Sequence, residues 1–455
     1  MLLKIILIGL YFFNLATGRD LSWKHYPYQD PHSTIRFPED EGGHKMIPNL
    51  EWWYTVIHAK GEESGESYSI LVTHFNNHFR FFTVTNLDRK QHISGTTVGQ
   101  LNSKIGFLDL QHKTKYGIDI YRSRVDSNNQ LIPFEYEIKT HHKRMNLDVT
   151  LSGIKKPLMI KGSGHTEVGS SGHTWYYSLT RLDVSGTLDI DGVKEKIKGE
   201  AWMDHQWGPF IVSPVSIGNM FESYEWFCLQ LNDGSDLMIS NIFDRDFNLP
   251  LDEKYGGVEI IDVEGSSKYT ANRKFTRLGY WQDPVSGHYM SMGWRLEVPE
   301  WKVDLTFMPN FLEQMVHMPF NGDFWEGSIK VTGTIAGKNV WGNAFGELIH
   351  RYQVPQIEIK KIKINKPKTF IEISWKINNP DAGNPLTYQV ELIQSQKKWV
   401  LAKDLKEKEG HFLIPQNLDR MLEGKGREKM EVRVIGSSVD KTLVGYAQKY
   451  LSSTL

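Results

Sequence analysis

The chain has 455 residues, of which 40% are hydrophobic, 24% charged and 12% aromatic, with 14 tryptophans. This length predicts two to four domains, and the composition is ordinary for a globular protein. Lys and Arg number 53 against 54 Asp and Glu, and a net charge of −1 gives no sign of a nucleic-acid partner or of binding to an anionic membrane surface.

Residues 1–18 have the pattern of a secretory signal peptide. Lys4 precedes an apolar run over 5–15, and small residues at 16–18 offer a cleavage site before Arg19. The run is too short to cross a bilayer comfortably, and an uncleaved membrane anchor is the alternative. No cysteine lies near the cleavage site, so no lipid anchor is expected there. We therefore predict a secreted or periplasmic protein.

Strand-like alternation of apolar and polar residues dominates the chain after residue 48. Residues 19–48 are rich in Pro, His and Asp and predict an extended lead-in. The runs 51–58 and 68–75 flank a polar turn with glycine, which is typical of a β-hairpin. Helical periodicity is scarce, and its best short candidate is 309–316. The chain is predicted to be all-β.

An internal repeat divides the strand-rich region. Glu-Trp-Trp at 51–53 recurs as Glu-Trp-Phe at 225–227, and each is followed by a hairpin pattern. Gly-Thr at 186–187 and Gly-Glu at 199–200 both recur 147 positions later, the second pair at 346–347. Such matches predict two related antiparallel β units. We place them at 49–210 and 211–353.

Residues 354–455 differ in composition, with 18 Lys and Arg against 12 Asp and Glu. Apolar and polar residues alternate in three strand-like runs, at 371–377, 386–392 and 430–434. This pattern predicts a small β-sandwich of the fibronectin or immunoglobulin type. The lysine excess is typical of a solvated surface, and docking to a protein or other surface through this module is the alternative.

One short stretch carries an acid, an imidazole and two indoles: Trp202, Asp204, His205 and Trp207. At the offset of the repeat, the second unit has Arg-Tyr-Gln-Val at 351–354, so the cluster is specific to the first unit. On a regular strand His205 and Trp207 share one face and Asp204 the other, unless a bulge brings them together. The structural alternatives are a buried ion-pair carboxylate and a hydrogen-bonded core imidazole.

Motifs for other chemistries are missing from the sequence. It has no Ser-His-Asp signature, phosphate-binding loop or dinucleotide fingerprint. His74 and His78 are four residues apart, a spacing that brings two ligands together on a helix but not on the strand expected here. Cys228 lies between apolar residues and is predicted to be an inert core thiol. We therefore expect no metal site and no cofactor.

Four segments together resemble the lipocalin-like hydroxyneurosporene synthase family, which includes carotenoid hydratases, kievitone hydratase and fungal Diels–Alder cyclases. They are Phe-Pro through His at 37–44, Glu-Trp-Trp-Tyr at 51–54, Tyr-Tyr-Ser-Leu-Thr-Arg at 176–181, and Gly-Glu-Ala-Trp-Met-Asp-His-Gln-Trp-Gly at 199–208. The resemblance covers about 35–353. It implies two lipocalin-like β-barrels in tandem, with an apolar site in or between them.

The resemblance also implies roles for individual residues. In carotenoid hydratases a His-x-Trp pair is implicated in catalysis, and it matches His205 and Trp207. Those enzymes also use an acidic residue on a following strand. The corresponding stretch here, 226–231, offers Gln230 and no acid. This departure puts carotenoid-type hydration in doubt and leaves Asp204 as the better acid.

We therefore expect cofactor-free hydration or cyclisation of an apolar isoprenoid-like or polyketide-like molecule. Asp204 is the expected proton donor, His205 the orienting group and Trp207 part of the cavity wall. The residues expected to bind substrate are Trp53, Tyr54, Tyr177, Trp202, Trp226 and Gln230. The alternatives are a lipocalin-like lipid carrier without chemistry and an adhesion or assembly role centred on 354–455.

Overall fold

The computed structural model describes residues 20–45, 50–210, 222–318, 322–365, 370–379, 384–414 and 430–451. The predicted signal peptide lies outside this part of the chain. The helices in the described ranges are three-residue 3-10 turns, η1 (Glu39–Glu41), η2 (Ile160–Gly162), η4 (Glu253–Tyr255) and η5 (Pro299–Trp301). None of them has the length to cross a bilayer. Strands make up nearly all of the remaining regular structure, which confirms the all-β prediction.

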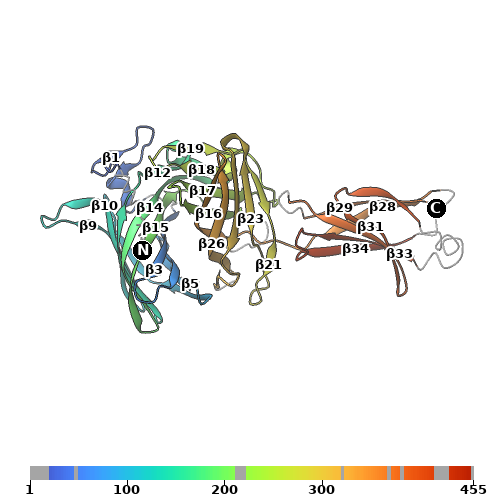
Figure 1. Ribbon diagram of the computed structural model, residues 1–455, viewed down its shortest axis with the longest axis horizontal. Coiled ribbons are helices and arrows are strands. Elements are labelled where there is room, and N and C mark those ends of the chain that lie inside the picture. Colours follow the sequence, from blue (N-terminus) through green and yellow to red (C-terminus); the bar gives the residue numbers. More distant parts are fainter. Residues whose placement is uncertain are drawn as a thin grey trace, which may run out of the picture.

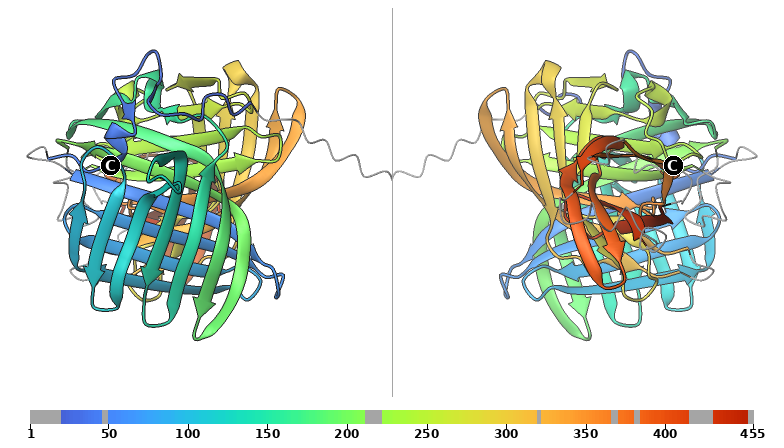
Figure 2. Two further views of the ribbon diagram at one scale, coloured as in Figure 1. Left: turned by 90° about the vertical axis from the view of Figure 1, so that its left-hand side faces the viewer. Right: turned by 90° about the vertical axis from the view of Figure 1, so that its right-hand side faces the viewer.

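The first β unit is a thirteen-stranded antiparallel sheet that curls into a nearly closed barrel, called barrel 1 here (Figures 1 and 2). Its strand order is β6-β5-β4-β3-β15-β14-β11-β10-β9-β8-β7, and β12 and β13 pair with β14. The strands are β3 (Leu50–Gly61), β4 (Ser67–Phe75), β5 (Phe79–Asn86), β6 (Gln91–Val98), β7 (Gln100–Ser103), β8 (Asp109–Thr114), β9 (Gly117–Val125), β10 (Leu131–His141), β11 (Met145–Gly153), β12 (Leu158–Met159), β13 (His165–Val168), β14 (Gly172–Ile190) and β15 (Val193–Gly208).

The lead-in closes one end of barrel 1. Two short strands, β1 (Tyr28–Gln29) and β2 (Arg36–Phe37), pair with each other before η1. Trp23, Ile35 and Phe37 belong to the apolar core of the barrel. The indole Nε1 of Trp53 on β3 donates to the carbonyl oxygen of Glu41 at 3.0 Å. The lead-in, predicted only to be extended, therefore packs against the core at the end of barrel 1 and is called the plug here.

The second β unit is a ten-stranded sheet that curls into a half-barrel, called half-barrel 2. Its order is β19-β18-β17-β16-β27-β26-β24-β23-β20, with β25 on β26 and a separate hairpin β21–β22. The strands are β16 (Ser223–Leu231), β17 (Asp236–Phe243), β18 (Val258–Ile261), β19 (Ser267–Thr270), β20 (Lys274–Arg277), β21 (Tyr280–Gln282), β22 (Tyr289–Ser291), β23 (Trp294–Val298), β24 (Val303–Pro309), β25 (Met315–Val316), β26 (Phe324–Ile335) and β27 (Lys338–Leu348).

The helix expected over 309–316 does not form. This stretch begins at the end of β24 and finishes as β25, which pairs with β26. Eight residues are too few for a helix that is stable by itself, and pairing with β26 satisfies the backbone instead.

The two units repeat one arrangement of strands, as the sequence predicted. The order β4-β3-β15-β14-β11 in barrel 1 corresponds to β17-β16-β27-β26-β24 in half-barrel 2. The constant offset of 147 does not describe this repeat. Trp53 pairs with His205, whereas its equivalent Phe227 pairs with Gly346. Gly346 therefore occupies the position of His205. The offset changes along the strand because β27 has 11 residues where β15 has 16.

The remaining strands form a two-sheet sandwich at the far end of the molecule (Figure 1). One sheet has β28 (Ile357–Ile364), β29 (Phe370–Ile377) and β32 (Glu409–Leu413), and the other has β30 (Thr387–Gln394), β31 (Lys397–Leu405), β33 (Met430–Ser437) and β34 (Val444–Tyr450). Its core contains alternating apolar residues such as Ile371, Ile373 and Trp375. The predicted order of two barrel-like units followed by a sandwich is confirmed.

Candidate active site

The neighbours Asp204 and His205 point to opposite faces of β15. The pairing of β15 with β3 runs without a break from Ile197 to Gly208. The irregularity nearby lies in the β14–β15 pairing between Leu179 and Leu182, so no bulge turns Asp204 toward His205. One strand therefore supplies groups to two separate places: the inside of barrel 1 and the space between the two units.

A cleft lies between the units and is called the interbarrel cleft here. The space not filled by atoms amounts to about 800 Å³, a figure that includes open solvent at its mouth. Both sheets contribute to its walls. β3, β14 and β16 supply most of the aromatic rings, and β15 supplies Asp204 and Gln206. The residues that line it include Trp52, Tyr54, Tyr176, Asp204, Tyr224 and Trp226. Clefts lined by aromatic rings with a few convergent polar groups are typical ligand sites.

Asp204 is the acid at the centre of this cleft. Its side chain is 3% exposed, and Oδ2 accepts a hydrogen bond from the hydroxyl of Tyr176 at 2.5 Å. Oδ1 accepts from Nε1 of Trp202 at 2.7 Å, and Nε1 of Trp226 donates to the Tyr176 hydroxyl at 3.0 Å. Burial raises the pKa of Asp204 to about 6, although these hydrogen bonds act in the opposite direction. The carboxyl can therefore hold a proton near neutral pH.

Two further acids meet at the wall formed by half-barrel 2. Glu326 on β26 and Glu347 on β27 are direct cross-strand partners, and Glu326 is buried whereas Glu347 is half-buried. The hydroxyl of Tyr54 donates to Glu326 at 2.8 Å, and that of Tyr224 donates to Glu347 at 2.7 Å. Burial raises the pKa of Glu347 to about 7, and burial together with Glu347 raises the pKa of Glu326.

Sequence reasoning missed this pair. The sequence repeat matches Gly346-Glu347 with Gly199-Glu200, which gives Glu347 no role in a site. In the structure Glu347 stands at the position of Gln206, and both line the cleft. Glu259 on β18 is another acid of the cleft that sequence reasoning missed, and burial raises its pKa to about 8. The Gly-Glu motif at 346–347 is visible in the sequence, but the sequence does not show which residues of the first unit occupy the equivalent positions.

The other residues expected to bind substrate divide between the two faces. Tyr54 and Trp226 line the interbarrel cleft, whereas Trp202 lies behind Asp204 in the apolar layer. Gln230 does not line the cleft. Its Nε2 donates to the backbone carbonyls of Thr180 and Ala201 at 2.8 and 3.0 Å, which fastens β16 to barrel 1.

His205, Trp53, Tyr177 and Trp207 lie together inside barrel 1. The His205 ring stacks on Trp53 at 4.6 Å between centroids, and Tyr177 meets it edge-on at 5.5 Å. Nε2 of His205 is 3.1 Å from Oε1 of Glu51. Trp207 also reaches a more open groove at the end of the barrel. These four side chains do not touch the interbarrel cleft.

The fold and the site can now be compared with known proteins. A sequence profile described as AttH-like matches residues 28–350. The chain belongs to the AttH-like family. This match spans the lead-in and both β units of this AttH-like chain, and the family resemblance seen in the motifs is confirmed. No curated protein matches the chain in sequence.

Two solved structures share the fold. An AttH protein from Nitrosomonas europaea is 18% identical with a TM-score of 0.56, and the match covers 71% of this chain and 98% of that chain. Kievitone hydratase from Nectria haematococca is 16% identical with a TM-score of 0.54, and the match covers 71% and 93%. At these identities the likeness shows a common architecture.

Proposed function

We propose that this AttH-like chain is a hydro-lyase or cyclase that acts without a cofactor on an apolar isoprenoid-like or polyketide-like molecule bound in the interbarrel cleft. The observation that carries the proposal is Asp204, a buried carboxyl hydrogen-bonded to Tyr176 among aromatic rings. A carboxyl in such a setting is suited to general-acid catalysis. The kievitone hydratase fold neighbour is named for a hydration, which supports the same class of reaction.

In the hydration, Asp204 transfers its proton to an alkene carbon. The π electrons form the new C–H bond and leave a cation on the adjacent carbon, which the faces of Trp52 and Trp226 stabilise. A water molecule adds to the cation through oxygen and then loses a proton to the Asp204 carboxylate, which restores the acid. Because His205 faces the inside of barrel 1, the orienting role in this proposal passes to Gln206, which lines the cleft.

The decisive variant is Asp204→Asn. It keeps the shape of the site and removes the proton donor, so turnover should fall by at least about 100-fold while ligand binding changes little. Asp183→Asn, an exposed change on β14, is the matched control. The probe is the compound extracted from the protein as purified from its native host and identified by mass spectrometry, followed by a panel of acyclic isoprenoid alkenes and prenylated phenols.

A different result would favour the alternative class. If the natural chain binds the extracted compound but turns over neither it nor any member of the panel, the protein is a lipid carrier. If Asp204→Asn turns over substrate like the natural chain, Asp204 is not the proton donor.

We also propose export of the chain and a docking role for the sandwich. Export is supported by the signal-peptide pattern, and the mature protein is expected to begin at Arg19 when its N-terminus is sequenced.

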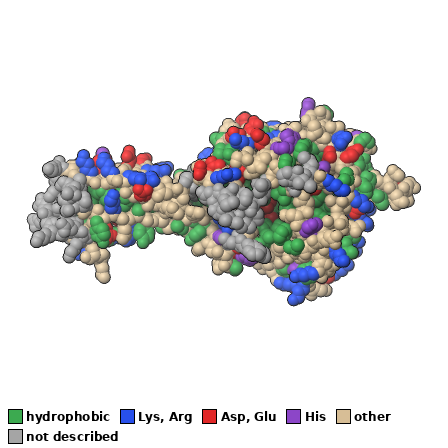
Figure 3. Space-filling model, turned by 180° about the vertical axis from the view of Figure 1, so that it is seen from behind, with side chains coloured by type: hydrophobic (Ala, Val, Ile, Leu, Met, Phe, Trp, Pro, Cys, Tyr) green, Lys and Arg blue, Asp and Glu red, His purple; other side chains and the backbone are tan. Residues whose placement is uncertain are grey.

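On the sandwich, Lys and Glu side chains lie close together (Figure 3), as with Lys376 and Glu358 at 3.1 Å. This pairing offsets part of the lysine excess. The docking role is tested by purifying the full chain and a chain that lacks 354–455: a partner should co-purify with the first and not with the second.

A further inference from the structure

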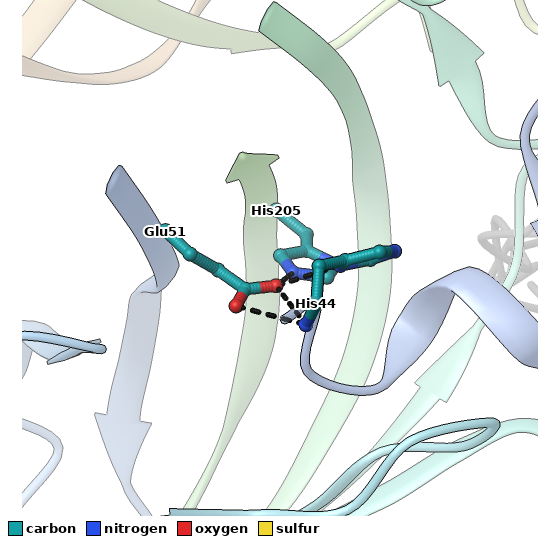
Figure 4. Close-up of side chains that lie close together, drawn as sticks. All are labelled: His44, Glu51 and His205. Carbon is teal, nitrogen blue, oxygen red and sulfur yellow. Dashed lines mark hydrogen bonds and ion pairs between the residues drawn. The ribbon is translucent and has the colours of Figure 1, made fainter. Parts of the chain in front are cut away.

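Three side chains meet at the closed end of barrel 1 from three separate segments (Figure 4). His44 comes from the lead-in, Glu51 from the start of β3 and His205 from β15. Nδ1 of His44 is 2.8 Å from Oε1 of Glu51, and Nε2 of His205 is 3.1 Å from the same oxygen. Among the described residues these form a group of His and acidic side chains whose ligand atoms all lie within 4.8 Å of one another.

These distances are close to those of a metal site. With metal–ligand bonds of about 2.0–2.1 Å, ligand atoms in a tetrahedral site lie about 3.3 Å apart. The two measured separations need to open by only a few tenths of an ångström. Two imidazoles with one carboxylate suit Zn²⁺ and related first-row ions, whereas Ca²⁺ and Mg²⁺ prefer oxygen ligands.

The surroundings fix the two imidazole rings in place. The His44 ring lies parallel to Trp207 at 4.0 Å, and the His205 ring lies between Trp53 and Trp207. Oδ1 of Asp40 is 3.3 Å from Nε2 of His44, on the far side of its ring from Glu51. A carboxylate behind a histidine ligand in this way is the usual outer shell of a metal site.

The equivalent carboxylate of the second unit has a different partner. Glu225, the repeat equivalent of Glu51, is equally buried, and Nη2 of Arg277 lies 2.7 Å from its Oε2. The guanidinium is a permanent cation, so that carboxylate is neutralised within the chain. Glu51 has two imidazoles in that place. A buried carboxylate requires a compensating charge, which a metal ion bound between these imidazoles and Glu51 would supply with both rings neutral.

We propose that His44, Glu51 and His205 bind one divalent transition-metal ion of the Zn²⁺ type, which fastens the lead-in onto β3 and β15. The site lies on the face of β15 opposite to the interbarrel cleft and does not depend on the proposed chemistry there. Its role is to hold the plug of barrel 1 in place. Water or an external group completes the coordination.

The test uses the full chain, purified without a chelator and without metal-affinity chromatography. Elemental analysis should find about one transition-metal ion per chain. After dialysis against EDTA, titration with Zn²⁺ should show one site and raise the thermal unfolding temperature, because the ion binds only the folded state. Co²⁺ in place of Zn²⁺ should give the visible absorption of a nitrogen- and oxygen-ligated ion.

Variants separate this site from adventitious binding. Glu51→Gln should weaken Zn²⁺ binding by at least about tenfold and abolish the thermal shift. His44→Ala should likewise weaken Zn²⁺ binding. Because His44 is less buried than Glu51, this variant keeps the test available if Glu51→Gln fails to fold. Glu225→Gln is the matched control, expected to lose stability and keep the metal. The proposal is overturned if the apo protein binds neither Zn²⁺ nor Co²⁺, or if His44→Ala binds Zn²⁺ as well as the natural chain does.

Discussion

Glu326 and Glu347 face each other across β26 and β27, and each accepts a hydrogen bond from a tyrosine of a different strand. Burial and the charge of Glu347 raise the pKa of Glu326, and burial raises the pKa of Glu347. Ionising both carboxyls would place two like charges at neighbouring positions, so protonation of at least one of them is favoured. Glu347 lines the interbarrel cleft together with Asp204.

Stability should fall as pH rises because of this pair. The pKa of Glu347 is raised from an ordinary 4.5 to about 7, so the folded state binds more protons than the unfolded state in this window. Its contribution is fully present below about pH 4.5 and is lost as pH rises through about 7. Glu347→Gln should therefore flatten the fall in unfolding free energy between pH 5 and pH 8 by about 2 kcal/mol.

Urea unfolding at pH 5 and at pH 8 measures this difference. Glu264→Gln, an exposed change in a turn, serves as the control and should leave the pH dependence as it is. An unchanged slope in Glu347→Gln would mean that Glu347 is ionised in the folded protein across the whole range.

The hydroxyl of Tyr176 should set the pH range of activity. Its hydrogen bond favours the ionised form of Asp204 and lowers the pKa of that carboxyl. In Tyr176→Phe the pKa rises further, so a reaction that needs protonated Asp204 should persist to higher pH. The alkaline limb of the kcat/KM profile, near pH 6 in the natural chain, should move upward.

Tyr54→Phe is the matched control for this experiment, because the Tyr54 hydroxyl bonds to Glu326 and not to Asp204. That variant should leave the alkaline limb in place even if its rate falls. A limb that stays fixed in Tyr176→Phe would show that another group controls the profile.

An ion-pair network between the two units should be essential for stability. Asp236 on β17 is buried, and its oxygens lie 2.6 Å from Nζ of Lys155 and 2.6 Å from Nη2 of Arg181. Asp236→Ala leaves Lys155 without the carboxylate that it contacts, whereas Arg181 keeps only its second partner, Glu200 at 3.1 Å, and we expect a loss of about 3–5 kcal/mol of unfolding free energy. Urea denaturation measures it. Arg144→Ala, which breaks a solvent-exposed pair with Asp191, is the control and should change the unfolding free energy much less, because water and salt screen exposed ion pairs.

Removal of the sandwich should leave the cleft intact. The module meets half-barrel 2 through Leu443, which packs near Phe243, Tyr280 and Tyr352, and through Asp440, whose Oδ2 accepts from the Tyr280 amide at 2.7 Å. A chain truncated after residue 353 exposes this small apolar contact and should unfold at a lower temperature. Quenching of tryptophan fluorescence by the ligand should be retained, and its loss in a folded truncation would place part of the site on the sandwich.

Local sequence patterns were enough to predict the architecture. Alternation at 371–377 predicted a sandwich strand, and the Glu-Trp-Trp and Glu-Trp-Phe motifs revealed the doubled unit. The regular period of two placed Asp204 and His205 on opposite faces unless a bulge intervened, and the unbroken pairing of β15 with β3 decides for opposite faces. These results depend on neighbours in the chain, because side-chain direction along a strand repeats every two residues.

The site itself depended on strand pairing that the sequence does not specify. Tyr54 and Glu326 are 272 positions apart, and His205 and Glu51 are 154 apart, yet each pair is in hydrogen-bond contact. Register between distant strands is decided by the packing of whole sheets and by hairpin length, not by local composition. The sequence by itself therefore determined an all-β, doubled AttH-like chain with one unusual acidic and aromatic stretch. Only the tertiary structure decided that Asp204 opens onto a cleft with Glu347, while His205 turns inward to meet His44 and Glu51.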